Sequence, residues 1–155
     1  MSPTATSLHR RPQRGRAHGF TLIELMIALV VVSVLAMVAL PSFLQQVRKG
    51  HRSDAEAAIN AVLQAQERWR GDNTTYSASM ANLVAANLGV ATTSSLGYYT
   101  IATSTATASA GYAYVVTATA VGSQTNDSAC TVMTLTANQR SSPSLSYTPA
   151  ACWGR

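Results

Sequence analysis

Charged side chains are scarce in this chain. Only 11% of its 155 residues are charged, and six residues are Asp or Glu. Three histidines and two cysteines are present, and His9 and His18 fall within the first 19 residues, which leaves His51 for the rest. The two cysteines, Cys130 and Cys152, lack C-x-x-C spacing. These shortages exclude a histidine metal cluster and argue against a redox-active cysteine pair.

Catalytic signatures are also missing. The chain has no nucleophile elbow and no phosphate-binding loop. Its acidic residues are scattered, mostly at expected helix-surface positions, so a carboxylate pair for acid-base chemistry is not favoured. We therefore expect no catalytic residue, no metal ion and no cofactor. A membrane-anchored enzyme is the least favoured of the functional hypotheses.

The basic residues are concentrated at the start of the chain. The formal net charge is +5, but four of the 11 basic residues, Arg10, Arg11, Arg14 and Arg16, precede Gly19. Residues 20–155 are nearly balanced in charge. The excess is better explained by the positive-inside rule for membrane proteins than by a phosphate-binding surface. Nucleic-acid binding stays open as an alternative.

An uninterrupted apolar run follows this basic segment. From Phe20 to Leu44 it contains one charged residue, Glu24. As a helix the run is about 37 Å long, which is enough to span a hydrocarbon core of about 30 Å. A carboxylate at the centre of such a helix costs roughly 2.5 to 3.5 kcal/mol, so Glu24 indicates a function. The run is too long for an ordinary secretory signal.

The residues from Gly19 to Glu24 read G-F-T-L-I-E, and with the apolar run they resemble the processing site of type IV prepilins. The resemblance implies that a prepilin peptidase cuts between Gly19 and Phe20, that Phe20 is then N-methylated, and that Glu24 is needed for assembly. It also implies an inner-membrane precursor, with a cytoplasmic leader, that assembly machinery incorporates into a cell-surface pilus with other pilin subunits.

Cleavage would place the new amine of Phe20 about one helical turn from the carboxylate of Glu24. In staggered apolar helices, Glu24 of one chain can pair with the Phe20 amine of a neighbour and set the register. The alternative is that Glu24 is solvated at the membrane interface and the run is an ordinary anchor.

We expect one long, bent helix. Pro41 removes a backbone hydrogen bond and predicts a kink. After Gly50, helical spacing predicts one face with Ala55, Ala58, Ile59, Val62, Ala65, Gln66 and Trp69, and an opposite polar face with Asp54, Glu56, Asn60, Gln64 and Arg68. The capping-box spacing of Ser53 and Glu56 leaves a second helix start as the alternative.

The rest of the chain predicts a small antiparallel sheet. A short helix is expected within residues 79–87, and alternation predicts strands at 98–104, 112–120 and 130–137. Short gaps favour a meander covering the apolar helix face. The fold class is therefore α+β: a long N-terminal helix, with a transmembrane half and an amphipathic half, packed on an antiparallel sheet, as in type IV pilins.

The C-terminal stretch 141–155 lacks periodicity and is expected to be an irregular loop. An even cysteine count in an exported domain favours a Cys130–Cys152 disulfide over two unpaired thiols. The bracketed segment resembles the C-terminal loop of pilins, most like the PilE-type minor pilins. Trp69, Tyr76, Tyr112, Tyr114 and Trp153 are interpreted as core residues, and Arg140 as a solvated turn residue or a contact to DNA or another subunit.

The predicted organisation is a leader at 1–19, a transmembrane and filament-core helix at 20–44, and a globular domain at 45–155. The leading hypothesis is a type IV pilus subunit, a minor pilin rather than the abundant one, serving motility, adhesion or DNA uptake. A pseudopilin of a type II secretion system and a filament-tip module that binds DNA or a surface are the alternatives.

Overall fold

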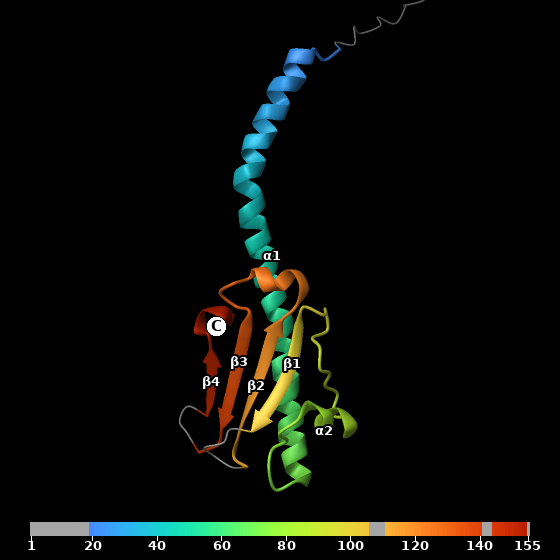
Figure 1. Cartoon of the computed structure of the whole chain (residues 1–155), viewed down its shortest axis with the longest axis vertical. Coiled ribbons are helices and arrows are strands. Elements are labelled where there is room, and N and C mark those ends of the chain that lie inside the picture. The colour runs from blue at the N-terminus through green and yellow to red at the C-terminus, as the bar shows by residue number, and fades with distance from the viewer. Residues whose placement is uncertain (1–18, 106–110, 141–143, 155) are drawn as a thin grey trace, which may run out of the picture. The chain divides into compact units, whose positions relative to one another are not determined.

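A computed structural model describes residues 19–105, 111–140 and 144–154 (Figure 1). The chain forms two compact units, Met1–Ala39 and Leu40–Arg155. The expected leader lies outside the described residues, except for Gly19. In the second unit, helix and sheet segments pack together, whereas the described part of the first unit is helical from Leu22 onward.

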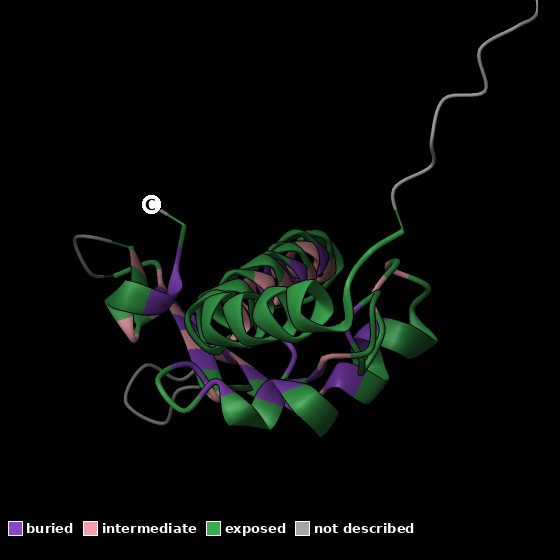
Figure 2. Cartoon of the chain, turned by 90° about the horizontal axis from the view of Figure 1, so that it is seen from above, coloured by how far each residue is buried: buried purple, intermediate pink, exposed green. Residues whose placement is uncertain are grey.

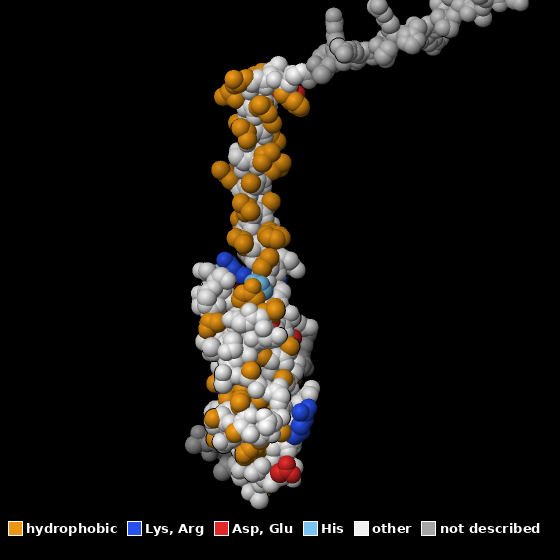
Figure 3. Space-filling model, turned by 90° about the vertical axis from the view of Figure 1, so that its right-hand side faces the viewer, with side chains coloured by type: hydrophobic (Ala, Val, Ile, Leu, Met, Phe, Trp, Pro, Cys, Tyr) orange, Lys and Arg blue, Asp and Glu red, His pale blue; other side chains and the backbone are white. Residues whose placement is uncertain are grey.

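Helix α1 (Leu22–Asp72) begins in the first unit. Its large apolar side chains up to Leu40 are each 52–77% exposed, and they occupy successive positions on every side of the helix. Figure 3 shows those on the face in view. A helix that is apolar on every side requires a nonaqueous environment or neighbouring helices. By length and composition, α1 is sufficient to cross a membrane.

The helix continues without a break through Pro41 and Gly50. The Ser53 hydroxyl donates to the Gly50 carbonyl at 2.6 Å, a bond typical of serine within a helix. The prediction of one long helix is confirmed, and a second helix start at Ser53 is wrong. The kink at Pro41 stays a prediction.

The second unit contains a four-stranded antiparallel sheet in the order β1-β2-β3-β4. The strands are β1 (Tyr99–Thr105), β2 (Ala113–Ala120), β3 (Val132–Asn138) and β4 (Leu145–Thr148). Two 3₁₀ helices follow β2 and β4, namely η2 (Gly122–Asn126) and η3 (Ala150–Cys152). The three predicted strands and the meander are confirmed to within two residues.

The expectation of an irregular C-terminal stretch is wrong for its described part. β4 pairs with β3 through the partners Thr134 with Thr148 and Leu135 with Tyr147. The free edge of β3 supplies backbone partners to a segment too short and too irregular to show a strand period. The start of the stretch, 141–143, and Arg155 lie outside the described residues.

One face of the second part of α1 packs on one face of the sheet (Figure 2). The side chains that are at most 1% exposed in this core include Ala55, Ile59, Val62, Ala65, Tyr114, Val116, Ala118, Met133 and Leu135. The apolar stripe predicted for the helix is therefore confirmed. The polar face is partly wrong, because Asp54 is 8% exposed and accepts from the backbone N–H of Leu96.

A buried glutamine ties three segments together. The side-chain amide of Gln66, on α1, donates to the Ser77 carbonyl at 2.8 Å and to Thr103 Oγ1 at 3.0 Å. Its Oε1 accepts from the Ser77 N–H at 2.9 Å. Ser77 lies just before α2 (Met80–Ala85), the predicted short helix, whose N-cap is Ser79. Gln66 therefore fixes this connection against β1.

We predict that Gln66→Leu lowers the free energy of unfolding by about 2–4 kcal/mol, because it leaves the buried N–H and carbonyl of Ser77 without their partner and removes one bond to Thr103. Denaturant titration of the full chain in detergent, followed by tryptophan fluorescence, measures this change. Gln64→Leu, at an exposed site on the same helix, is the control and should stay within about 0.5 kcal/mol of the parent. Equal effects of the two substitutions would show that the buried bonds contribute no net stability.

Candidate functional site: the helix start, the disulfide and a basic cluster

The residues of the expected cleavage site precede the helix. Gly19 and Phe20 are exposed and lie outside α1. A Cβ built on Gly19 would meet no atom within 4 Å. The peptide between these two residues is thus open to an enzyme. In the uncut chain the nitrogen of Phe20 is a peptide nitrogen, so any ion pair with Glu24 requires cleavage first.

Thr21 forms the start of the helix. Its hydroxyl accepts from the Glu24 N–H at 3.3 Å, and its carbonyl accepts from the Leu25 N–H at 3.3 Å. Thr21 and Glu24 have the T-x-x-E spacing of a capping box, so this helix start has a signal in the sequence in addition to the processing motif. Glu24 lies in the first turn, where the positive end of the helix dipole favours a carboxylate.

Cys130 and Cys152 form a disulfide with a Cα–Cα distance of 5.7 Å, as predicted. Both cysteines are at most 2% exposed. Trp153 packs edge-on against Tyr147 at 4.8 Å, and the Gly154 N–H donates to Glu56 Oε1 at 2.7 Å. The C-terminal segment is therefore held to Cys130, just before β3, to β4 and to α1.

Two arginines lie beside one aromatic ring at the end of the sheet. The guanidinium carbon of Arg140 is 3.7 Å from the ring centroid of Tyr112, and that of Arg70 is 6.0 Å from it. We call Arg70, Tyr112 and Arg140 the Tyr112 cluster. Tyr112 is 37% exposed, so its interpretation as a core residue is wrong, whereas Tyr76, Tyr114 and Trp153 are buried as expected.

The Tyr112 cluster depends on the pairing of distant turns. The Tyr112 carbonyl accepts from the Gln139 N–H at 3.1 Å, which places Arg140 next to the ring. Gly111 has φ +83°, and a Cβ there would lie 2.8 Å from Thr75 Cγ2, so only glycine fits this close approach. Of the three residues, Arg140 alone was a candidate contact residue from the sequence. Arg70 and Tyr112 were missed because the end of α1 and the turns at Tyr112 and Arg140 come together only in the folded chain.

Tyr76 lies next to the cluster and is 3% exposed. Its hydroxyl donates to Glu67 Oε1 at 3.0 Å and accepts from the side-chain amide of Gln139. Burial, together with the bond to Glu67, raises the pKa of Tyr76 to about 12. Arg70 lies 5.9 Å from the same ring.

Asp127 and the residues around it are held by a network of bonds within the second unit. Arg52 forms a bidentate pair with Asp127 at 2.7 and 2.8 Å, and this hydrogen-bonded pairing raises the pKa of Arg52. The buried amide of Gln124 donates to Tyr99 Oη at 3.0 Å, and its Oε1 lies 2.9 Å from His51 Nδ1. Within residues 19–105, 111–140 and 144–154, no three His, Cys, Asp or Glu side chains are grouped to hold a metal ion.

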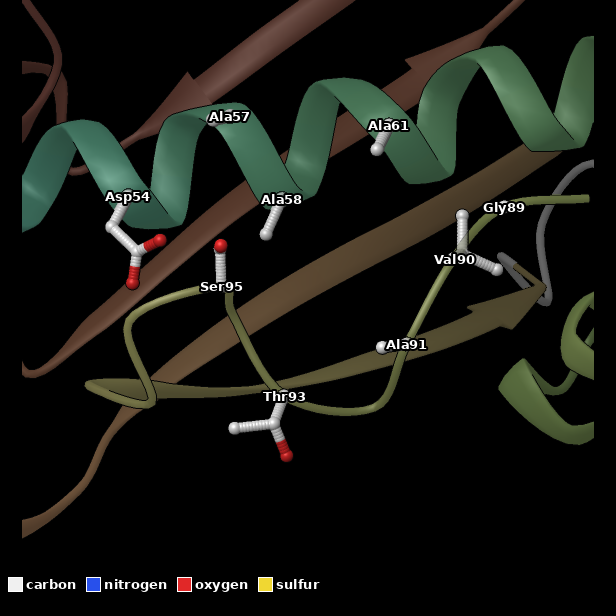
Figure 4. A pocket seen from close by; sticks show the side chains of 9 residues that line it. All are labelled: Asp54, Ala57, Ala58, Ala61, Gly89, Val90, Ala91, Thr93 and Ser95. Atoms are coloured by element: carbon white, nitrogen blue, oxygen red, sulfur yellow. The ribbon is translucent and has the colours of Figure 1, made fainter.

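A groove of about 370 Å³ separates α1 from the segment before β1 (Figure 4). Small side chains of α1, among them Ala57, Ala58 and Ala61, form one wall. The Asp54 carboxylate points toward the opposite segment and accepts from the Leu96 N–H. The Asp54 carboxylate is therefore already hydrogen-bonded within the fold.

Together, the apolar helix start, the helix packed on an antiparallel sheet and the disulfide-bracketed end define the class of type IV pilin-like filament subunits. Residues 14–40 match the prokaryotic N-terminal methylation motif. Residues 41–134 match the family described as type IV minor pilin ComP, DNA uptake sequence receptor. The chain belongs to this family of type IV pilins, and it is a type IV pilus structural subunit.

Several relatives are pilins or secretion proteins. The chain is 31% identical over 90 residues to the type IV wide pilus major component PilA4 of Thermus thermophilus, covering 58% of this chain and 67% of the relative. It is 36% identical over 62 residues to the type IV major pilin PilA of Myxococcus xanthus, covering 40% and 28%. It is 30% identical over 73 residues to the type II secretion system core protein G of Pseudomonas aeruginosa, covering 47% and 51%.

We predict that stability falls between pH 10 and about pH 12, partly through Tyr76. A tyrosine with a raised pKa in the folded state keeps its proton there while the unfolded chain loses it, so rising pH favours unfolding. Tyr76→Phe should make the decline shallower when unfolding free energies are measured across this range. The difference in unfolding free energy between the parent and Tyr76→Phe at neutral pH is the reference from which the change with pH is measured. Parallel pH profiles would contradict this role of Tyr76.

Proposed function

We propose that this chain is a prepilin that is cut between Gly19 and Phe20 and methylated on Phe20. Residues 20–44 span the inner membrane in the precursor and pack in the filament core after assembly, and residues 45–155 form the globular pilin domain. The observation that carries this proposal is the apolar surface of α1, exposed on all sides before Leu44. The match to the methylation motif over residues 14–40 supports it.

Glu24 guides assembly in this proposal. Its carboxylate has no hydrogen-bond or ion-pair partner among the described residues. The methylated amine of Phe20 on a neighbouring subunit supplies that partner in an apolar bundle. Leaving either charge unpaired there costs about 3–5 kcal/mol. Subunits in the wrong register are disfavoured by the same amount.

The partners are a prepilin peptidase, assembly machinery in the inner membrane and other pilin subunits. The leader faces the cytoplasm before cleavage, and the assembled subunit lies on the cell surface. A structural subunit needs no catalytic residue. The pilus is favoured over a type II secretion pseudopilus by the family match and by the Cys130–Cys152 disulfide.

A second candidate function is DNA binding by the assembled subunit. The family description names a DNA uptake sequence receptor. The Tyr112 cluster has the required chemistry, because its two guanidinium groups can contact the phosphates of a duplex. Arg140 and Tyr112 lie within 3.7 Å of one another at the surface. In this second proposal, the subunit binds DNA for uptake in addition to its structural role in the pilus.

We predict that Glu24→Val leaves processing and membrane insertion intact but lowers filament yield on the order of a hundredfold, as expected for an unpaired charge in the bundle. The measurement is the N-terminal mass and amount of protein in sheared filaments and in membranes. Asp72→Asn, at the exposed end of α1, is the control and should assemble normally.

A methylated N-terminus at Phe20 in filaments of the parent protein is the expected mass. An intact leader on protein confined to the membrane, despite an active peptidase, would overturn the processing proposal. Normal filament yield from Glu24→Val would overturn the pairing proposal alone.

For DNA binding, we predict that the double variant Arg70→Gln/Arg140→Gln weakens binding of a short duplex about tenfold and reduces the salt slope by roughly 2, because two phosphate contacts are lost. Fluorescence anisotropy at several salt concentrations measures both quantities. The matched control is Arg48→Gln/Lys49→Gln, which removes the same charge elsewhere. Equal losses in the two variants would contradict a specific role of the cluster, and thermal unfolding checks that both remain folded.

A further inference from the structure

A basic band follows directly after the apolar part of α1. Leu40, Phe43 and Leu44 are exposed, and Arg48 and Lys49 come in the next turn of the same helix. In Figure 3, basic side chains and a histidine lie next to the last hydrophobic side chains of the helix. Among the described residues, the side chains of Arg48 and Lys49 form no hydrogen bond or ion pair within the fold, and they lie outside the proposed DNA site.

The position of Arg48 and Lys49 along α1 determines how deep they lie in a membrane. Leu44 is the last residue of the apolar run, and Arg48 lies four residues later, about 6 Å along the axis. The headgroup layer on each side of a bilayer is also roughly 5–8 Å thick. When residues 20–44 span the hydrocarbon, Arg48 and Lys49 therefore lie at the level of the lipid phosphates.

Both charges are available for a ligand. Among the described residues, no side chain pairs with the Arg48 guanidinium or the Lys49 ammonium. The neighbouring Arg52 is neutralised by Asp127. Glu56, further along α1, accepts from the Gly154 N–H. The band thus carries two positive charges without an acidic partner.

Two small cavities flank Arg48 between α1 and the η2 region. One, of about 280 Å³, is lined by Arg48, Lys49 and Ser128, together with the Arg52–Asp127 pair. The other, of about 250 Å³, is lined by Leu44 and Val47 on one side and by Arg48, His51, Ser123, Gln124 and Asn126. A charged cavity beside apolar side chains of the helix matches a phosphate group that lies next to the acyl chains of the same lipid.

The wall of these cavities is fixed before any ligand arrives. Gln124, at the centre of η2, is fully buried. Its amide donates to the Arg48 carbonyl at 3.3 Å, and its Oε1 lies 2.9 Å from His51 Nδ1. The His51 ring stacks on Tyr98 at 3.6 Å. These contacts hold η2 against the helix.

We propose that Arg48, Lys49 and Ser128 bind the phosphate of an anionic phospholipid in the leaflet where residues 20–44 leave the membrane. This inference rests on the proposed membrane-spanning role of those residues. The adjacent exposed Phe43 and Leu44 favour a lipid over nucleic acid, because DNA phosphates gain nothing from an apolar neighbour. The contact sets the depth of the subunit before assembly and must be released when the subunit enters a filament.

The test uses the full chain reconstituted in nanodiscs of phosphatidylcholine with a minor share of phosphatidylglycerol. The protein is released in mild detergent, and native mass spectrometry counts the lipids that remain bound. We expect phosphatidylglycerol to be enriched about tenfold over its share in the bilayer, since each basic residue near the surface adds severalfold. Arg48→Gln/Lys49→Gln should abolish the enrichment, and Arg70→Gln/Arg140→Gln, with the same charge change, should keep it. Lys49→Gln alone, at an exposed site, should give an intermediate value.

Each other outcome overturns the inference. Insertion without enrichment rejects the lipid site and leaves the membrane anchor standing, whereas failure to insert rejects both. Equal losses in the two double variants indicate general charge attraction. Enrichment that disappears in excess inorganic phosphate identifies a free anion as the ligand. Loss of duplex DNA binding in Arg48→Gln/Lys49→Gln, with lipid enrichment unchanged, assigns the band to nucleic acid.

Discussion

The burial of one face of α1 on the sheet is the contact on which the rest of the second unit depends. Ile59 and Val62 are at most 1% exposed in this contact, and burying such a side chain contributes about 1.5–3 kcal/mol. The same helix carries apolar residues on every side before Leu44. One continuous helix thus meets a protein core along part of its length and requires lipid or other helices along the remainder.

Charged side chains are few, and they lie at separate places along α1. Arg48 and Lys49 lie directly after the apolar run, and Arg70 lies near the end of α1, about 33 Å further along the helix. Between them, Arg52 is neutralised by Asp127 and Asp54 accepts from a backbone N–H. Arg48 and Lys49 are therefore far enough from Arg70 to serve the two different anions proposed above, a lipid at one end and DNA at the other.

Much of the fold was predictable because its signals are local. The apolar run and the helix stripe follow from side-chain periodicity, and the first three strands follow from alternation between turns. The cysteine pair was predicted from count and compartment, and the structure confirms it. The helix start at Thr21 and Glu24 is local in the same sense, because a capping box joins residues only three positions apart.

Other features required the folded chain. β4 is a strand because it forms backbone hydrogen bonds with the edge of β3. Asp54 is buried where it accepts a hydrogen bond from the Leu96 N–H, 42 residues away in the sequence. The Tyr112 cluster forms only where two turns meet. By itself, the sequence determined the membrane-length helix, the processing motif and the strand pattern, since these depend on neighbouring residues. Only the tertiary structure decided which polar groups pair and which stay available, since those partners are distant along the chain.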